Sequence, residues 1–269
     1  MKKSRLPALL AAITLLSLLF PALSLSVETP EEVRLSADRM RFDAQSGDFL
    51  ATGGVLVQAE GLTLMAPRGT GNVQTKDVYF TEGIVASGDW RGDWIDLKAG
   101  AIELHFAQTP TYTAEGKVEG VVGKLSIDAD KLYMKGSDIS ALNVRRLEDL
   151  EAGIAFGAGS VRGTLTNGVL TSFTAQKKVW LQGRPSQSGD MVDLRGDMAV
   201  YSIERGSVVL SGNVRAVQKG RTLTAPSLVY FPANNRVEAI GGGYSEAGSE
   251  KERVTITIDL KQEKQEKKQ

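Results

Sequence analysis

Residues 35–83 read LSADRMRFDAQSGDFLATGGVLVQAEGLTLMAPRGTGNVQTKDVYFTEG, and the chain contains a second version of this stretch. Shifting the sequence by 159 positions (194 − 35) places it without a gap on residues 194–242, which read LRGDMAVYSIERGSVVLSGNVRAVQKGRTLTAPSLVYFPANNRVEAIGG. Several glycines, one aspartate and an Ala-Pro pair coincide, whereas the side chains between them vary. Turn residues that recur at fixed spacing indicate a structural repeat, because a duplicated catalytic site would repeat reactive groups.

Apolar and polar residues alternate within both copies, which is typical of β-strands with one buried face. In the first copy we expect strands over residues 35–42, 49–58 and 62–66. The apolar residues of the second copy keep the same phase as those of the first. A one-residue slip would turn every side chain to the other face, so the shared phase defines one interior face.

The rest of the chain continues in short strands separated by glycines. We predict strands over residues 78–86, 94–98, 101–107, 111–116 and 118–122, and a third, weaker copy of the opening strand at residues 127–134. Residues 143–152 are the exception: five charged side chains crowd there, which favours a helical turn or a charged loop. With 29 glycines, 6% aromatic residues and no helix-length 3.6-residue period, the sequence predicts an all-β fold, a sandwich, jellyroll or elongated β-stack.

The ends of the chain are set apart by composition. Residues 1–26 combine a basic start, an apolar run and small residues at a cleavage site, which predicts a signal peptide; a retained inner-membrane anchor is the alternative. Residues 260–269 are predicted to be a disordered charged tail. Between them we expect a first β unit at residues 33–120, a weaker middle unit at residues 121–189 and a second full unit at residues 190–259.

Composition argues against several classes of function. The chain has no cysteine and a single histidine, His105, which we expect to be an outward surface residue without a Ser or Asp partner. We therefore expect neither an enzyme nor a cofactor or metal site. Without residues 1–26 the chain carries 29 basic and 32 acidic residues, which argues against nucleic-acid binding. The tripeptide Arg91-Gly92-Asp93 is a cell-adhesion motif, but here we interpret it as a hairpin turn.

The recurring motifs resemble a known family. They are Ala37-Asp38, Gly53-Gly54-Val55 and Thr63-Leu64-Met65-Ala66-Pro67, followed in the second copy by Gly196-Asp197, Gly212-Asn213-Val214 and Thr222-Leu223-Thr224-Ala225-Pro226. Their order resembles the OstA-like (organic solvent tolerance N-terminal) domain of LptA-type periplasmic lipopolysaccharide-transport proteins. The resemblance covers most of residues 35–243. It implies an elongated open β-jellyroll of stacked antiparallel sheets, with an apolar trough for acyl chains and ends that pair edge to edge.

This resemblance gives the interior residues a role. We expect the trough to be lined by residues of both copies: Phe49, Val55, Val57, Leu62, Leu64, Val208, Leu210, Val214 and Leu223. The alternative is that they pack against each other as a dry core. The implied partners are the lipid A acyl chains of lipopolysaccharide and other β-jellyroll proteins of the transport bridge, with a possible head-to-tail homo-oligomer. The implied location is the periplasm, in an LptA-type role or, with a retained anchor, an LptC-like role. A structural or adhesive envelope protein without lipid cargo is the rival function.

Overall fold

The computed structural model describes residues 33–59, 61–90, 93–105, 111–150, 154–166, 169–183, 191–218, 221–234, 236–241 and 254–258. The chain divides into two compact units, and the division falls between Ile139 and Ser140. The predicted signal peptide and charged tail lie outside the described residues. Among the described residues, the structure contains no helix with the length and apolar character needed to span a membrane.

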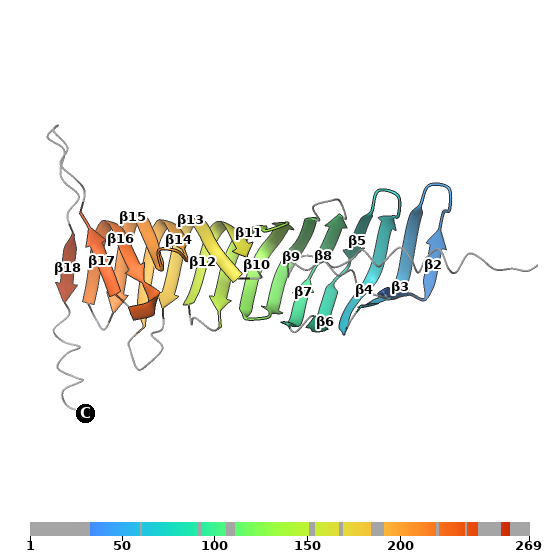
Figure 1. The fold of residues 1–269 in the computed structure, drawn as a ribbon, viewed down its shortest axis with the longest axis horizontal. Helices are drawn as coiled ribbons and strands as arrows, with labels where there is room; N and C mark the ends of the chain where they lie inside the picture. Colours follow the sequence, from blue (N-terminus) through green and yellow to red (C-terminus); the bar gives the residue numbers. More distant parts are fainter. Residues whose placement is uncertain are drawn as a thin grey trace, which may run out of the picture. The chain divides into compact units, whose positions relative to one another are not determined.

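The first unit consists of antiparallel strands (Figure 1). They are β1 (Val33–Ser36), β2 (Arg39–Phe42), β3 (Asp48–Ala59), β4 (Leu62–Asn72), β5 (Asp77–Thr81), β6 (Ile84–Trp90), β7 (Asp93–Ala99), β8 (Ala101–His105), β9 (Thr111–Val122) and β10 (Leu125–Lys135). The second unit contains β11 (Asp138–Asp149), which begins at the boundary, then β12 (Ile154–Thr166), β13 (Val169–Gly183), β14 (Val192–Ser202), β15 (Ser207–Gln218), β16 (Arg221–Phe231), the short 3₁₀ helix η1 (Pro232–Asn234), β17 (Arg236–Ile240) and β18 (Thr255–Ile258). The all-β prediction is confirmed.

The long strands of the first unit are each divided into two halves. The first half of β3 pairs with β2, and its second half pairs with β1. Strand β4 pairs with β5 along Arg68–Asn72 and with β6 along Leu62–Met65. Strand β5 then pairs with β8 and β6 with β7, and both β7 and β8 pair with β9. The unit therefore consists of two half-sheets. Each long strand passes from one half-sheet to the other at a bend, which we call a corner.

The repeated motifs form these corners. The register between β3 and β4 shifts between Thr52 and Val55, where Gly53 and Gly54 have left-handed backbone angles (φ 78° and 68°). Pro67 lies opposite this shift, and it has no N–H to leave unpaired where the ladder is interrupted. The Asp38 N–H donates to the carbonyl oxygen of Gly53 at 2.9 Å. The Gly-Gly, Ala-Pro and Ala-Asp motifs are thus three parts of one corner.

The second copy builds the same corner in the second unit. The register between β15 and β16 shifts between Ser211 and Val214, with Gly212 at φ 73° and Asn213 at φ 50°. The Asn213 Nδ2 donates to Asp197 Oδ2 at 2.7 Å. Strand β16 then pairs with β17 along one half and with β18 along the other, as β4 pairs with β5 and β6. The repeat therefore extends beyond residue 242 to the last strand.

Four predicted elements differ from the structure. The strand predicted over residues 35–42 forms two strands, β1 and β2, with a break at Ala37 and Asp38. The stretch 78–86 forms two strands, because Glu82 and Gly83 turn the chain at a corner with φ 73° and 95°. Residues 111–122 form one strand, β9, bent at Gly116 rather than interrupted. The predicted helical turn or loop at 143–152 is wrong: residues up to Asp149 belong to β11. There, Asn143 at φ 49° lies between the buried Ala141 and Val144, which are three residues apart instead of the two of a regular strand.

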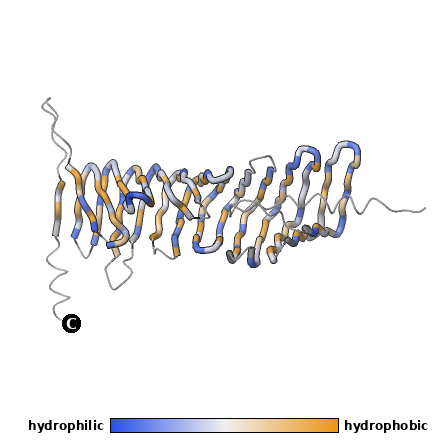
Figure 2. The backbone as a smooth tube through the Cα atoms, in the orientation of Figure 1, coloured by the Kyte–Doolittle hydropathy of each residue, from blue (hydrophilic) through white to orange (hydrophobic). Residues whose placement is uncertain are grey.

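The core of each unit lies on the face that the half-sheets enclose. Apolar and polar residues alternate along the strands, and hydrophilic residues gather at the hairpin turns after β2 and β4 (Figure 2). The largest fully buried side chains come from both units: Phe80, Ile84, Val55 and Val118 in the first, and Tyr230, Leu181, Leu194, Leu210, Leu228 and Val179 in the second. Below, "enclosed face" means this buried face of either unit.

Candidate functional site

The nine predicted trough residues all belong to strands that form the enclosed face. Eight are buried, with exposed fractions of 0–8%, and Leu223 is half-buried. In the first unit Val57 lies directly opposite Leu64 on the neighbouring strand, and Val55 lies opposite Ala66. In the second unit Val214 lies opposite Ala225. The two copies thus place their equivalent residues at equivalent positions.

Further buried residues share this face although the prediction did not include them. Strands β5, β6 and β9 contribute Phe80, Ile84 and Val118, and strands β13 and β14 contribute Leu181 and Leu194. Most of these strands lie in the part of the chain where the repeat is weak or absent. The alternation of apolar and polar residues along these strands was the sequence signal that could have identified their buried positions.

The enclosed face of the first unit is packed around two phenylalanine rings. A methyl group at Gly69 would lie 3.0 Å from the Phe80 ring, and one at Gly71 would lie 2.5 Å from the Phe49 ring. Both rings therefore lie against backbone that carries no side chain. A methyl group at Gly69 would also contact Val55, which belongs to the other half-sheet, at 3.7 Å. The two half-sheets thus approach each other closely beside the corner.

In the second unit, stacked aromatic rings join the half-sheets. Phe156 pairs with Leu181 in one half of the β12–β13 ladder, and Phe173 pairs with Gly163 in the other half. Their ring centroids are 4.4 Å apart with an interplanar angle of 13°. Tyr201 stacks on the other side of Phe173 at 5.3 Å. The interior at this level is occupied by side chains.

The enclosed face is uncovered at one edge of each unit. Met40 and Phe42 lie opposite the buried Ala51 and Phe49, yet they are 44% and 47% exposed because β2 pairs on only one side among the described residues. Likewise Ile256 of β18 lies opposite Leu223 and is 63% exposed. Within the described part of the chain, an exposed apolar surface coincides at these edges with a strand side that has no neighbouring strand.

The hydroxyl of Tyr112 is the one side-chain polar atom in the described residues that is buried without a hydrogen-bond partner. Its desolvation raises the pKa of Tyr112 to about 12. A buried hydroxyl left unsatisfied costs about 1–3 kcal/mol. No local pattern in the sequence indicates this group.

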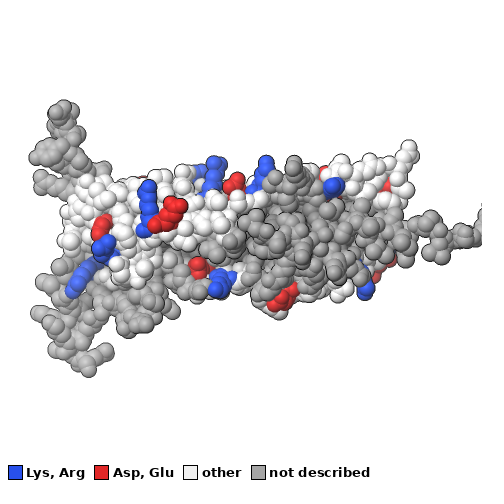
Figure 3. Space-filling model, in the orientation of Figure 1, with Lys and Arg blue, Asp and Glu red and all other residues white. Residues whose placement is uncertain are grey.

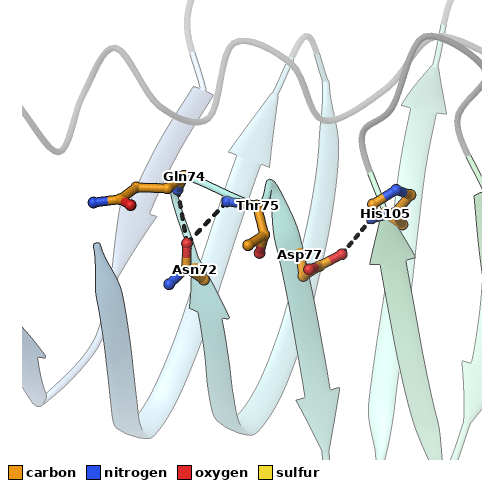
Figure 4. A network of polar contacts seen from close by, with 5 residues as sticks. All are labelled: Asn72, Gln74, Thr75, Asp77 and His105. Carbon is orange, nitrogen blue, oxygen red and sulfur yellow. Dashed lines mark hydrogen bonds and ion pairs between the residues drawn. The ribbon is translucent and has the colours of Figure 1, made fainter. Parts of the chain in front are cut away.

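His105 has a partner, contrary to the prediction. Its Nδ1 contacts Asp77 Oδ1 across the β5–β8 pair, and both side chains are about half exposed (45% and 50%). The Thr75 hydrogen bond and the His105 contact lower the pKa of Asp77. Nearby, Asn72 Oδ1 accepts from the N–H groups of Gln74 (2.8 Å) and Thr75 (2.9 Å) (Figure 4). These contacts hold a turn, and the partner was missed because it lies 28 residues away.

Other sequence motifs add no reactive centre within the described residues. No group of three or more His, Cys, Asp or Glu side chains is placed there to hold a metal ion. Charged side chains on the face shown in Figure 3 are spread out, with acidic groups among the basic ones. The Arg91-Gly92 pair of the adhesion tripeptide lies outside the described residues. An apolar face, rather than reactive chemistry, is the candidate site.

Comparisons with known proteins give limited information. No protein-family model matches the sequence, and no curated protein matches it significantly. One similar solved structure is the crystal structure of LptH, the LptA-homologous periplasmic component of the conserved lipopolysaccharide transport device from Pseudomonas aeruginosa. The match has 15% sequence identity, covers 84% of this chain and 94% of that chain, and has a TM-score of 0.25. A TM-score this low does not establish a common fold, so the fold rests on the strand pairings above.

Proposed function

We propose that this protein is a periplasmic lipopolysaccharide-binding and transport protein that serves outer-membrane assembly. Its enclosed face would shield the acyl chains, and its strand edges would link it to similar β-jellyroll domains. The observation that carries the proposal is the apolar enclosed face of each unit, which continues to an uncovered edge at Met40 and Phe42 in the first unit and at Ile256 in the second. The OstA-like motifs of both copies, which form the corners of the fold, support it.

The energetics of the cargo suit an apolar face. Each methylene removed from water is worth about 0.8 kcal/mol, so burial of one chain of about 12 carbons gains roughly 10 kcal/mol. The described interior is filled by its own side chains, so acyl chains would enter as the two half-sheets separate. The corners are where such opening would occur, because the ladder is already interrupted at Gly53 and Gly212.

The edges suit assembly. An uncovered strand presents unpaired N–H and C=O groups that another strand can satisfy, and a neighbouring jellyroll would also cover the exposed apolar side chains. Head-to-tail pairing of β2 with β18 of a second copy, or of either edge with a partner jellyroll, would extend the enclosed face. Export by a cleaved signal peptide gives an LptA-type bridge, and a retained anchor gives an LptC-like role.

A structural or adhesive β-stack without lipid cargo is the second candidate. The stacked rings of Phe156 and Phe173 favour it, because they fill the interior of the second unit. The low exposure of Val55 and Leu210, each 0%, is also what a dry core gives.

In-cell photo-crosslinking separates these functions. A photoreactive residue replaces Leu64, which is 4% exposed on the enclosed face, or its neighbour Met65, which is 47% exposed on the opposite face. Transport requires a lipopolysaccharide adduct at position 64 and little at position 65. Adducts at neither position, or equal adducts at both in folded protein, support the β-stack.

Edge assembly has its own test. Replacing Met40 and Phe42 with Asp should weaken self-association or partner capture in sedimentation experiments, because charges would replace the uncovered apolar side chains. Tyr79→Asp is the matched control, since Tyr79 is 40% exposed on β5, which has neighbouring strands on both sides. If both changes weaken association equally, the β2 edge is not the surface through which the protein associates.

A further inference from the structure

Tyr112 lies on the enclosed face of the first unit. It is the second residue of β9, and its direct neighbours across the two ladders are Leu104 of β8 and Met134 of β10. Residues opposite each other in antiparallel strands project to the same side. Leu104 is buried, and so is Ala114, two residues further along β9. The phenol ring therefore shares its surroundings with apolar side chains.

The Tyr112 hydroxyl is a hydrogen-bond donor without an acceptor. Its oxygen is shielded from solvent and makes no hydrogen bond, whereas buried tyrosine hydroxyls usually have a partner. Tyr230 on the enclosed face of the second unit does have an interaction partner. Because burial raises the pKa of Tyr112 to about 12, the group keeps its proton at physiological pH.

We propose that the Tyr112 hydroxyl binds the carbonyl oxygen of an ester- or amide-linked acyl chain that enters the first unit. The inference rests on the proposed function and names the cargo chemistry that this unit recognises. A carbonyl oxygen is neutral and is satisfied by a single donor. An anionic phosphate would lose far more hydration beside a group that is shielded from solvent. A buried water needs two to four polar partners, whereas the Tyr112 hydroxyl has no hydrogen-bond partner.

The position of Tyr112 also orients the chain. The residue lies near the end of β9 that is remote from the corner at Gly116. A carbonyl held there leaves the hydrocarbon to run past Ala114 toward the corner, along the enclosed face. The polar head of the lipid then lies outside the strand ends.

The test compares two probes on the full chain without residues 1–26. Methyl decanoate carries an ester carbonyl, and undecane is a hydrocarbon of similar length. We expect Tyr112→Phe to weaken binding of methyl decanoate about three- to tenfold in calorimetry, the value of one hydrogen bond, and to leave undecane unchanged. The exposed Tyr79→Phe is the matched control and should change neither.

Two further readouts distinguish a binding role from a packing role. The carbonyl ¹³C resonance of labelled methyl decanoate should lie further downfield when the ester is bound to the wild type than when it is bound to Tyr112→Phe, because only the wild type donates a hydrogen bond to the carbonyl oxygen. Without ligand, Tyr112→Phe should raise Tm by about 2–4 °C, because an unsatisfied hydroxyl is removed.

Each outcome decides between the two proposals. If both probes bind the wild type and Tyr112→Phe changes neither affinity or both equally, the carbonyl contact is excluded and acyl binding stands. If neither probe binds the wild type, both the contact and the acyl-binding function are contradicted. A lower Tm of unliganded Tyr112→Phe would show that the hydroxyl already has a stabilising partner, which also overturns the inference.

Discussion

Two neighbouring glycines at one corner allow the corner geometry to be tested. Gly53 and Gly54 have similar left-handed angles, φ 78° and 68°. A methyl group at Gly54 would meet nothing within 4 Å, whereas one at Gly53 would lie 2.6 Å from Asp38 Oδ2 and 2.8 Å from Asp38 Cβ. Gly54→Ala therefore measures the backbone cost alone, and Gly53→Ala adds the collision with Asp38.

The magnitudes follow from these contacts. A left-handed angle costs a non-glycine residue about 1–2 kcal/mol, which is the expected loss for Gly54→Ala. In Gly53→Ala the Asp38 side chain and backbone must also move. This movement would weaken the 2.9 Å hydrogen bond from the Asp38 N–H to the carbonyl oxygen of residue 53. A hydrogen bond contributes about 0.5–1.5 kcal/mol. We therefore expect Gly53→Ala to cost about 1 kcal/mol more than Gly54→Ala.

Urea unfolding, monitored by circular dichroism, measures the free energy of unfolding of both variants, each with and without Asp38→Ala. Asp38→Ala removes the carboxylate that collides with a methyl group at Gly53. The excess cost of Gly53→Ala should then shrink, while the cost of Gly54→Ala stays the same. Equal costs for the two glycine variants, or an excess that is undiminished in the Asp38→Ala background, would refute the assignment of Asp38 to the corner. Part of the excess should remain there, because the Cβ of residue 38 still lies 2.8 Å from the added methyl group.

Other predictions concern the second unit and the turns. Phe173→Ala should destabilise the second unit by about 3–5 kcal/mol, because Phe173 is buried between Phe156 and Tyr201; a loss below 1 kcal/mol in urea unfolding would contradict the stacked interior. Hydrogen bonds from Asn72 and Ser46 lower the pKa of Asp48 below the usual 3.8. Asp48 therefore stabilises its turn fully above pH 3.8, and this stabilisation is lost as the pH falls through the lowered pKa. The protection of the Asp48 amide, which donates to Ser46 Oγ, against hydrogen exchange relative to its intrinsic rate should fall in that range, and Asp48→Asn should remove this pH dependence. A loss of protection that persists in Asp48→Asn would assign the effect elsewhere.

Sequence reasoning succeeded where the fold is specified locally. The glycines and the Ala-Pro pairs recur because each corner needs a left-handed backbone or a missing N–H, and these requirements fall on single residue types. The phase of Val55, Val57 and Leu64 followed from alternation alone. Both features can be recognised without knowing which strands pair.

The rest depended on register between strands that are distant in sequence. Asp77 meets His105 only because β5 pairs with β8, and Phe156 meets Phe173 only because β12 is bent. The β11 strand was missed because Asn143 at a left-handed angle shifts the apolar residues out of the two-residue period. The unsatisfied Tyr112 hydroxyl depends on what surrounds it in space, which no local pattern encodes.

The most direct test of an acyl-binding interior uses a lipid that carries a nitroxide near the end of one acyl chain. In methyl NMR spectra of the protein, a bound chain should broaden the resonances of Val57 and Leu64, which lie opposite each other on the enclosed face. The Met65 methyl, on the opposite face, should broaden clearly less than the Leu64 methyls, because it lies further from the nitroxide. Broadening of Met65 equal to that of Leu64, or no broadening at saturating lipid, would contradict the account.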